Sequence, residues 1–197
     1  PRTFAKTEPL CDAILDAYLP GNEGALAIAD IMIGKVNPSG KLPFTFPRFA
    51  GVHTTYDCKY TETLNNDFKP MGFDPLFYFG QGLSYSNFNY ANMKIENRDV
   101  TVKDTVSITV QLNNTSAIAG SETVLVYASD VYASITPSVK RLRAFKRVPL
   151  DKYEGKEVQI KIAISDLAYV GLDNKFIVEP GKFYINIANL KDSITVK

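Results

Sequence analysis

The second half of the chain alternates between apolar and polar residues. Alternation is cleanest over Val106–Leu112 and Val158–Ile164, and Thr123–Tyr127 and Lys182–Ile187 are also strand-like. Turn signals separate these runs, at Asn113-Asn114, Ala119-Gly120, Glu154-Gly155, Asp173-Asn174 and Pro180-Gly181. Short strands with such spacing are typical of an antiparallel β-sandwich. Residues 90–197 are therefore predicted to form an all-β module of the immunoglobulin-like or fibronectin-like type.

The first fifty residues have a different pattern, rich in Ala, Ile and Leu. Residues 22–33 are predicted to form a helix, with Asn22 capping its N-terminus and Gly34 ending it in a left-handed conformation. The helix is apolar on nearly every face, which indicates burial between other elements. Fifty residues cannot cover such a helix. We therefore expect residues 1–50 to be the end of a larger domain and not to fold on their own.

Two shorter stretches flank this helix. Residues 11–19 fit either a helical stripe or a buried strand. Leu42–Phe46 is predicted to be extended, because Pro43 and Pro47 exclude a helix. Residues 51–89 lack a steady period and are predicted to be an ordered connector packed against a surface, because they contain too many aromatic residues for a disordered linker: Tyr56, Tyr60, Phe68, Phe73, Phe77, Tyr78, Phe79, Tyr85 and Phe88.

Composition excludes several classes of function. The chain has 22 basic and 21 acidic residues, a net charge of +1 that gives no electrostatic case for nucleic acid or an anionic membrane. No apolar run reaches the roughly eighteen residues that span a bilayer. Because the chain begins with Pro1 rather than Met, we expect its true start to lie upstream.

Cysteine and histidine are too few to predict a metal or cofactor site. The two cysteines, Cys11 and Cys58, could form one bridge or remain free, and they show no metal-ligand spacing. The single histidine, His53, is far from either cysteine and is interpreted as a loop residue. We therefore predict no metal and no cofactor.

Hydrolysis of a glycosidic bond needs two carboxylates that face each other across the substrate. Glu23 lies at the predicted helix start, where its charge favours the helix dipole. Tyr60 and Glu62, in the aromatic connector, could hydrogen-bond a sugar hydroxyl, and the alternative for Glu62 is a solvated loop carboxylate. Three further carboxylates fall on or beside sandwich strands and are interpreted as surface residues: Glu122, Glu157 and Glu179.

The segment Phe79-Gly80-Gln81-Gly82-Leu83 contains two glycines but lacks the third glycine and the following helix of a nucleotide loop. Glycines spaced in this way let a backbone pass close to a neighbouring domain. We expect Gly80 and Gly82 to mark such a close approach.

Four stretches together resemble the C-terminal third of family 3 glycoside hydrolases, in order and in spacing, and the resemblance covers nearly the whole chain. The second and third are highly specific together. The stretches are Leu19–Gly24 with Ala27–Asp30 and Gly34, Asn37–Pro43 with Thr45–Pro47, Pro75–Tyr85 with Phe88, and Val178–Phe183. The sequence departs from the family pattern at Ala25 and Gln81.

The resemblance implies a layout in which residues 1–50 end an α/β sandwich domain, 51–89 wrap the enzyme body, and 90–197 form a fibronectin type III-like domain. It favours a strand for Ala13–Tyr18. It also implies that the nucleophilic aspartate belongs to a barrel domain and the acid/base glutamate to upstream α/β sequence. Glu8 is the only glutamate before the first stretch, and the residues around it do not match those around the family's acid/base glutamate. No catalytic residue is therefore assigned.

The leading hypothesis is the C-terminal part of a retaining exo-acting β-glycosidase that removes glucose or xylose from β-linked oligosaccharides or glucosides. Its partners would be the barrel and α/β domains, and the sequence does not decide whether the protein forms a homo-oligomer. The resemblance implies a periplasmic or secreted protein. One alternative is a carbohydrate- or protein-binding sandwich, for which Tyr127, Tyr132 and Tyr153 are the candidate aromatics. Another is an accessory subunit of a split glycosidase.

Overall fold

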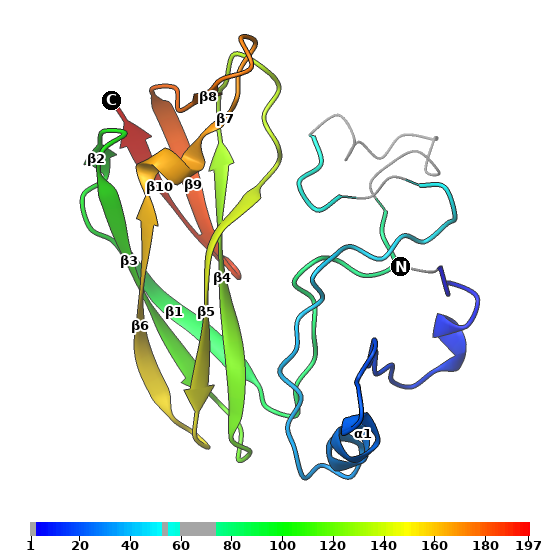
Figure 1. Ribbon diagram of the computed structural model, residues 1–197. Helices are drawn as coiled ribbons and strands as arrows, with labels where there is room; N and C mark the ends of the chain where they lie inside the picture. Colours follow the sequence, from blue (N-terminus) through cyan, green and yellow to red (C-terminus); the bar gives the residue numbers. More distant parts are fainter. Residues whose placement is uncertain (1–2, 53–54, 60–73) are drawn as a thin grey trace.

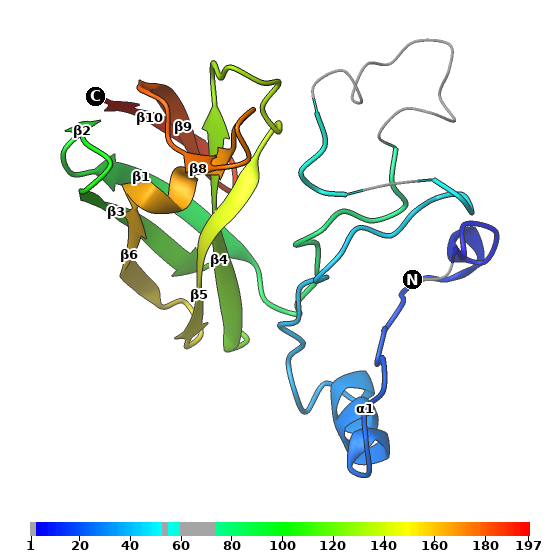
Figure 2. The ribbon, with the colours of Figure 1, turned by 45° about the horizontal axis from the view of Figure 1, so that its top comes forward.

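The computed structural model describes residues 3–52, 55–59 and 74–197, and the chain divides into two regions (Figure 1). Residues from Phe88 onward form two facing β-sheets. The segments before it form a short 3-10 helix (η1, Glu8–Leu10), one α-helix and long extended stretches beside the sheets, seen from two directions in Figures 1 and 2. Within the described ranges, no helix has the length and apolar character needed to cross a membrane.

The smaller sheet has the strand order β1-β3-β6 and is antiparallel throughout. The larger sheet has the order β2-β10-β9-β4-β5, antiparallel except for the parallel pair β10–β2. A two-stranded hairpin, β7–β8, lies at the upper end of the sheets in Figure 1, after the 3-10 helix η4. The bounds are β1 Phe88–Ile95, β2 Asp99–Val100, β3 Thr105–Asn114, β4 Gly120–Asp130, β5 Arg141–Leu150, β6 Gly155–Ala163, η4 Ile164–Leu167, β7 Tyr169–Val170, β8 Phe176–Ile177, β9 Gly181–Ile187 and β10 Leu190–Val196.

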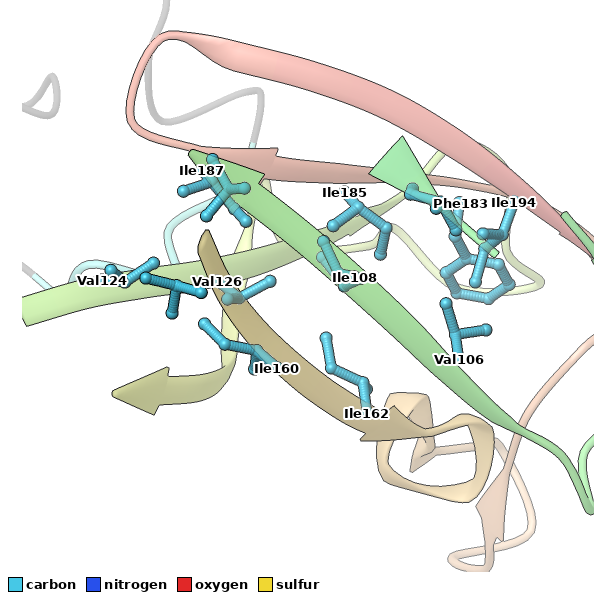
Figure 3. Packing of buried hydrophobic residues seen from close by; sticks show 14 of the residues in the cluster. Val106, Ile108, Val124, Val126, Ile160, Ile162, Phe183, Ile185, Ile187 and Ile194 are labelled. Carbon is cyan, nitrogen blue, oxygen red and sulfur yellow. The ribbon is translucent and has the colours of Figure 1, made fainter. Parts of the chain in front are cut away.

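The two sheets enclose one apolar core, because every second side chain of their strands points inward. The four strands predicted from alternation are present as β3, β4, β6 and β9. Figure 3 shows their inward residues meeting between the sheets. Complete burial of one such side chain stabilises the fold by about 1.5–3 kcal/mol. The most completely buried residues include Val106, Ile108, Val110, Leu112, Val124, Val126, Ile185 and Ile187.

The predicted turns are only partly correct. Tyr153 and Asn174 have positive φ angles of 58° in the turns predicted around residues 154 and 173. The turn predicted at residues 113–114 is wrong, because both residues belong to β3. Asn114 is buried, and its side-chain amide donates to the backbone oxygen of Ile118 at 2.8 Å. An Asn side chain often disfavours regular structure because it forms hydrogen bonds with nearby backbone groups. Here the hydrogen bond to Ile118 forms, and Asn114 nevertheless remains in the strand.

The predicted helix is present as α1, Gly24–Met32. Gly34 ends it with a φ of +76°, as expected. Asn22 does not cap it, because the helix begins only at Gly24 and Glu23 holds the N-cap position. The helix lies apart from the sheets in Figures 1 and 2, and Gly24 is its only buried residue. Leu26 and Met32 are exposed and Ile28 and Ile31 are half-buried, so the described chain covers the apolar surface of α1 only in part.

The strand favoured over residues 13–18 is not formed. Residues 11–19, all of which the structure describes, have no regular secondary structure, and Leu15 and Leu19 are exposed. A strand requires hydrogen-bond partners on a neighbouring strand. None of the described segments pairs with residues 11–19 as such a neighbour, and Tyr18 has a left-handed φ of 48°, which interrupts an extended backbone.

The expected extended run at residues 42–46 is present, and it pairs with residues 76–81. Backbone hydrogen bonds of 2.8–2.9 Å join Leu42 to Gly80 and Gln81, and Phe46 to Leu76 and Phe77. The two traces run side by side in Figures 1 and 2. The two most specific stretches of the sequence are therefore held together as a two-stranded ribbon. Aromatic rings pack around one end of it, from Phe4, Phe44, Phe46 and Phe77.

Candidate functional site: the junction between ribbon and sandwich

The ribbon meets the sandwich at Asn37, whose side chain satisfies four polar groups at once. Its amide nitrogen donates to the Ser86 hydroxyl at 2.7 Å and to the Ala119 backbone oxygen at 2.9 Å. Its amide oxygen accepts from the Ser84 hydroxyl and the Tyr85 backbone N–H, both at 2.8 Å. Asn37 therefore joins the end of α1 to the start of β1 and to the turn before β4. The sequence indicated only a turn here, since nothing in the local pattern shows a contact so distant along the chain.

A charged contact joins the same two regions. Lys41 of the ribbon lies 3.1 Å from a Glu122 carboxylate oxygen, and the other oxygen accepts from the Tyr90 hydroxyl at 3.0 Å. The prediction that Glu122 is a surface residue is wrong. It lies on the inward side of β4, two residues before Val124, and is buried. A carboxylate is tolerated there because Lys41 and Tyr90 compensate for its lost hydration. Burial, followed by the Glu122 charge, raises the pKa of the Tyr90 hydroxyl.

Gly80 and Gly82 occupy positions where a side chain would collide. Gly80 has a φ of +80°, and a Cβ there would lie 2.7 Å from the Leu125 Cδ1 on the outer face of β4. A Cβ on Gly82 would lie 2.1 Å from the Gly40 backbone oxygen. The expected close approach to a neighbouring domain is present at Gly80, which lies against β4 of the sandwich. Gly82 instead lies against residues 40–41, in the other strand region of the ribbon.

Tyr56 holds the next part of the connector to the sandwich. Its ring stacks on Phe79 with 4.3 Å between centroids and meets Tyr127 edge-on at 6.3 Å. Its hydroxyl accepts from the Leu142 backbone N–H at 3.3 Å. Tyr127 is buried, and this burial raises the pKa of its hydroxyl to about 12. The Lys140 ammonium lies 4.6 Å from the Tyr127 ring centroid.

The backbone at residues 58–59 is bound to the loop between β4 and β5. The Val139 N–H donates to the Cys58 oxygen at 2.8 Å, and the Lys59 ammonium donates to the Thr136 oxygen at 2.7 Å. Cys58 is buried and Cys11 is exposed, and no bridge joins them. The sandwich therefore fixes the position from which the chain enters residues 60–73.

The candidate substrate-binding residues Tyr60 and Glu62, and also His53, lie outside the described residues. Their assignment stays a prediction. What the structure adds is the anchorage on both sides of Tyr60 and Glu62, at Lys59 and at residues 76–81.

The other carboxylates singled out in the sequence have structural surroundings. Glu23 is exposed at the start of α1, and Glu157 is exposed on β6. Glu179 is half-buried and accepts from the backbone N–H of Ser134 at 2.8 Å and from its hydroxyl. These bonds hold the loop after β4 against the segment before β9. Among the described residues, no three His, Cys, Asp or Glu side chains gather as a metal site would require.

The aromatics that could favour a binding platform are not in a row. Tyr127 is buried in the junction. Tyr132 and Tyr153 are 85% and 68% exposed, but Tyr132 follows β4 and Tyr153 follows β5. Because β4 and β5 are antiparallel, these residues lie at opposite ends of the sheet. They cannot contact one flat ligand surface together.

Family models match two parts of the chain. The glycosyl hydrolase family 3 C-terminal domain matches residues 1–85, and the fibronectin type III-like domain matches residues 122–190. The two matches meet in space at the junction, where Lys41 pairs with Glu122.

Whole-chain comparisons agree. The chain is 37% identical to a lysosomal beta glucosidase of Dictyostelium discoideum, covering 91% of this chain and 22% of that protein. It is 34% identical to a periplasmic beta-glucosidase of Salmonella typhimurium, covering 100% of this chain and 27% of that protein. Among solved structures, a β-glucosidase of Erythrobacter marinus superposes with a TM-score of 0.89 at 36% identity, covering 97% of this chain and 26% of that one. The chain thus spans about a quarter of the length of these relatives.

Proposed function

Because the chain is the C-terminal portion of a glycosyl hydrolase family 3 protein, we propose that the whole protein is a retaining exo-acting β-glycosidase. It removes glucose or xylose from the non-reducing ends of β-linked substrates through a covalent glycosyl-enzyme intermediate. The names of the relatives, which are β-glucosidases, support this activity. The catalytic carboxylates belong to sequence upstream of this chain.

Within that enzyme, residues 1–50 complete an α/β sandwich domain and residues 90–197 form the fibronectin type III-like domain. Residues 51–89 connect these two domains. The observation that carries this role is the exposed apolar surface of the first region. Leu26, Met32 and Ile33 are 60%, 73% and 74% exposed on and beside α1. Exposed patches of large apolar residues mark surfaces that other parts of a protein cover. The upstream part of the α/β domain is the partner that covers α1.

The connector supplies an edge of the active site through Tyr60 and Glu62. This part of the proposal is supported by the anchorage of Tyr56 and Lys59 on the sandwich. A loop that contributes hydrogen bonds to a substrate must be held by rigid elements on both sides. In the whole enzyme, the sandwich therefore has the function of holding this loop.

The enzyme acts outside the cytoplasm, in the periplasm or after secretion. The names of two relatives support this location, one being lysosomal and the other periplasmic. Cell fractionation tests it, and recovery of the whole protein with cytosolic markers would contradict it.

Activity is tested with the whole protein and with residues 1–197 alone, each purified and assayed on aryl β-glucoside and aryl β-xyloside. The whole protein should release aglycone and give a product of retained configuration, and the 197-residue chain should be inactive. Activity that co-purifies with the 197-residue chain would refute the assignment of catalysis to upstream sequence.

The role of the connector is tested in the whole enzyme with Glu62→Gln. Loss of a hydrogen bond from a charged group should lower kcat/KM by roughly tenfold or more. Glu157→Gln, which removes an exposed carboxylate from β6, is the matched control and should leave kcat/KM unchanged. Equal values for the two variants would exclude Glu62 from the active-site edge.

A further inference from the structure

A pocket of about 280 Å³ opens beside the β4–β5 loop, at the end of the sandwich that carries β7 and β8. Its apolar wall includes Phe183, a buried core residue. Its charged lining consists of Arg141 and Arg143 from β5, Asp130 from the end of β4, and Asp57 and Lys59 from the connector. The Lys59 ammonium donates to the Thr136 backbone oxygen. The pocket therefore combines three cations, two carboxylates and an apolar surface.

The two arginines are the unusual feature of this pocket. Arg141 and Arg143 are two residues apart on β5, at an irregularity in its pairing with β4, and both line the pocket. In the described chain, neither forms a salt bridge with any carboxylate. Arg143 donates from one terminal nitrogen to the Leu167 backbone oxygen at 3.3 Å, and its Nε is buried without a partner among the described residues.

This arrangement is electrostatically unfavourable as it stands. Burial of the Arg143 guanidinium, and then the nearby charge of Arg141, lower the pKa of Arg143, and the opposing influence of Asp166 is smaller. Arg143 is half-buried, but its Nε is fully buried, and an unsatisfied buried donor costs free energy until an acceptor reaches it. A bound carboxylate would accept hydrogen bonds in the planar geometry that a guanidinium presents and would offset the repulsion between the two arginines.

The remaining lining defines what else the ligand must carry. Asp57 and Asp130 can accept hydrogen bonds from hydroxyl groups, and they would repel a ligand with a second negative charge. Phe183 offers contact to C–H groups. The volume lies just below the roughly 300–1,000 Å³ range of ligand pockets, which suits a ligand of one ring. These demands together describe a single-ring polyhydroxy acid with one carboxylate.

We propose that this pocket binds a sugar acid of the uronate class. Arg141 and Arg143 hold its carboxylate, and Asp57 and Asp130 accept hydrogen bonds from its hydroxyl groups. The proposal concerns residues of this chain alone, and it goes beyond the glycosidase activity of the whole protein.

The test is a titration of the 197-residue chain with glucuronate, followed by calorimetry or NMR, with glucose and inorganic phosphate as comparison probes. Glucuronate should bind more tightly than glucose, which lacks the carboxylate, and than phosphate, whose second charge meets the two aspartates. Arg141→Gln should weaken glucuronate binding by about tenfold or more, the effect of losing one charge-assisted hydrogen bond. Arg98→Gln, which removes an exposed guanidinium paired with Asp192, is the matched control and should leave binding unchanged.

Arg141→Lys keeps the positive charge and loses the planar fork, so it should fold and bind glucuronate with intermediate affinity. Circular dichroism establishes that each variant is folded. The proposal is overturned if millimolar glucuronate does not bind the wild-type chain, if phosphate or glucose binds at least as tightly, or if Arg141→Gln and Arg98→Gln behave alike. A further outcome would also overturn the proposal: the wild-type chain does not bind glucuronate, and Arg141→Gln strongly lowers the stability of the fold. That combination would show that a carboxylate of the chain itself already neutralises the arginines.

Discussion

Two isoleucines show the contrast between the regions of this molecule. Ile108 in β3 is fully buried, whereas Ile33 at the end of α1 is 74% exposed. Both lie in apolar sequence that indicates burial, yet only Ile108 finds its partners within the chain. The sandwich gathers both of its apolar sheet faces from residues 88–197. An apolar pattern thus shows that a residue needs a cover, and it does not show where the cover lies.

The sharpest test of this contrast separates the two regions. Residues 86–197 should melt cooperatively as a monomer, because they hold every strand of both sheets. Residues 1–50 should show no cooperative transition, because an uncovered helix forgoes several kcal/mol at about 25 cal/mol per Å2 of apolar area. Circular dichroism and calorimetry measure both. A cooperative melt of the short piece as a monomer, or none for the long piece, would contradict the comparison. The cut lies before residue 88, because β1 begins there.

Single substitutions should show the same contrast in the intact 197-residue chain. Ile108→Ala removes fully buried atoms and should lower the free energy of unfolding by about 2–5 kcal/mol. Ile33→Ala is the matched control and should change it by less than about 0.5 kcal/mol. Urea denaturation gives both values. In the whole enzyme, Ile33→Ala should become destabilising, since upstream sequence covers α1 there. An equal effect of Ile33→Ala in both proteins would argue against that cover.

The contact between the two regions should have an intermediate effect. Glu122→Gln removes the negative charge that compensates the Lys41 ammonium, which keeps its hydrogen bond to the Gly82 oxygen, and should destabilise the chain by about 1–3 kcal/mol. Adding Lys41→Met to Glu122→Gln should recover part of this loss, because the unpaired cation is gone. A double-mutant cycle from denaturant unfolding measures the coupling. Additive effects of the two substitutions would show that the pair does not join ribbon and sandwich energetically.

The smallest effect concerns the loop contact at Glu179. Hydrogen bonds from the Ser134 hydroxyl and backbone N–H lower the pKa of Glu179 below its ordinary value of 4.5. A carboxyl group with a lowered folded-state pKa stabilises the fold above its unfolded pKa, and this is lost as the pH falls through the folded value. The stability difference between wild type and Glu179→Gln should therefore shrink below about pH 4.5. Thermal melts across this range measure it, with Glu157→Gln as control, and a constant difference would refute the contact.

Local sequence predicted the elements whose determinants are local. The period-two pattern identified β3, β4, β6 and β9, and the apolar run ending at Gly34 identified α1. The spacing of Gly80 and Gly82 predicted a close approach. For the candidate site, Tyr60 and Glu62 rest on sequence and remain predictions, whereas the anchorage of Tyr56 was not predicted.

Other features required the tertiary structure because they depend on contacts between distant residues. Glu122 has the sequence surroundings of a surface residue, and its burial is tolerated only because Lys41, 81 residues earlier, and Tyr90, 32 residues earlier, meet it in space. Residues 11–19 have apolar strand-like sequence, but a strand forms only beside another strand. The sequence by itself thus determined which segments form strands, where glycines allow a close backbone approach, and which family the chain resembles. Which apolar faces are covered, and which charges are paired, was decided by the fold, because burial and pairing belong to sets of residues that the chain brings together only in space.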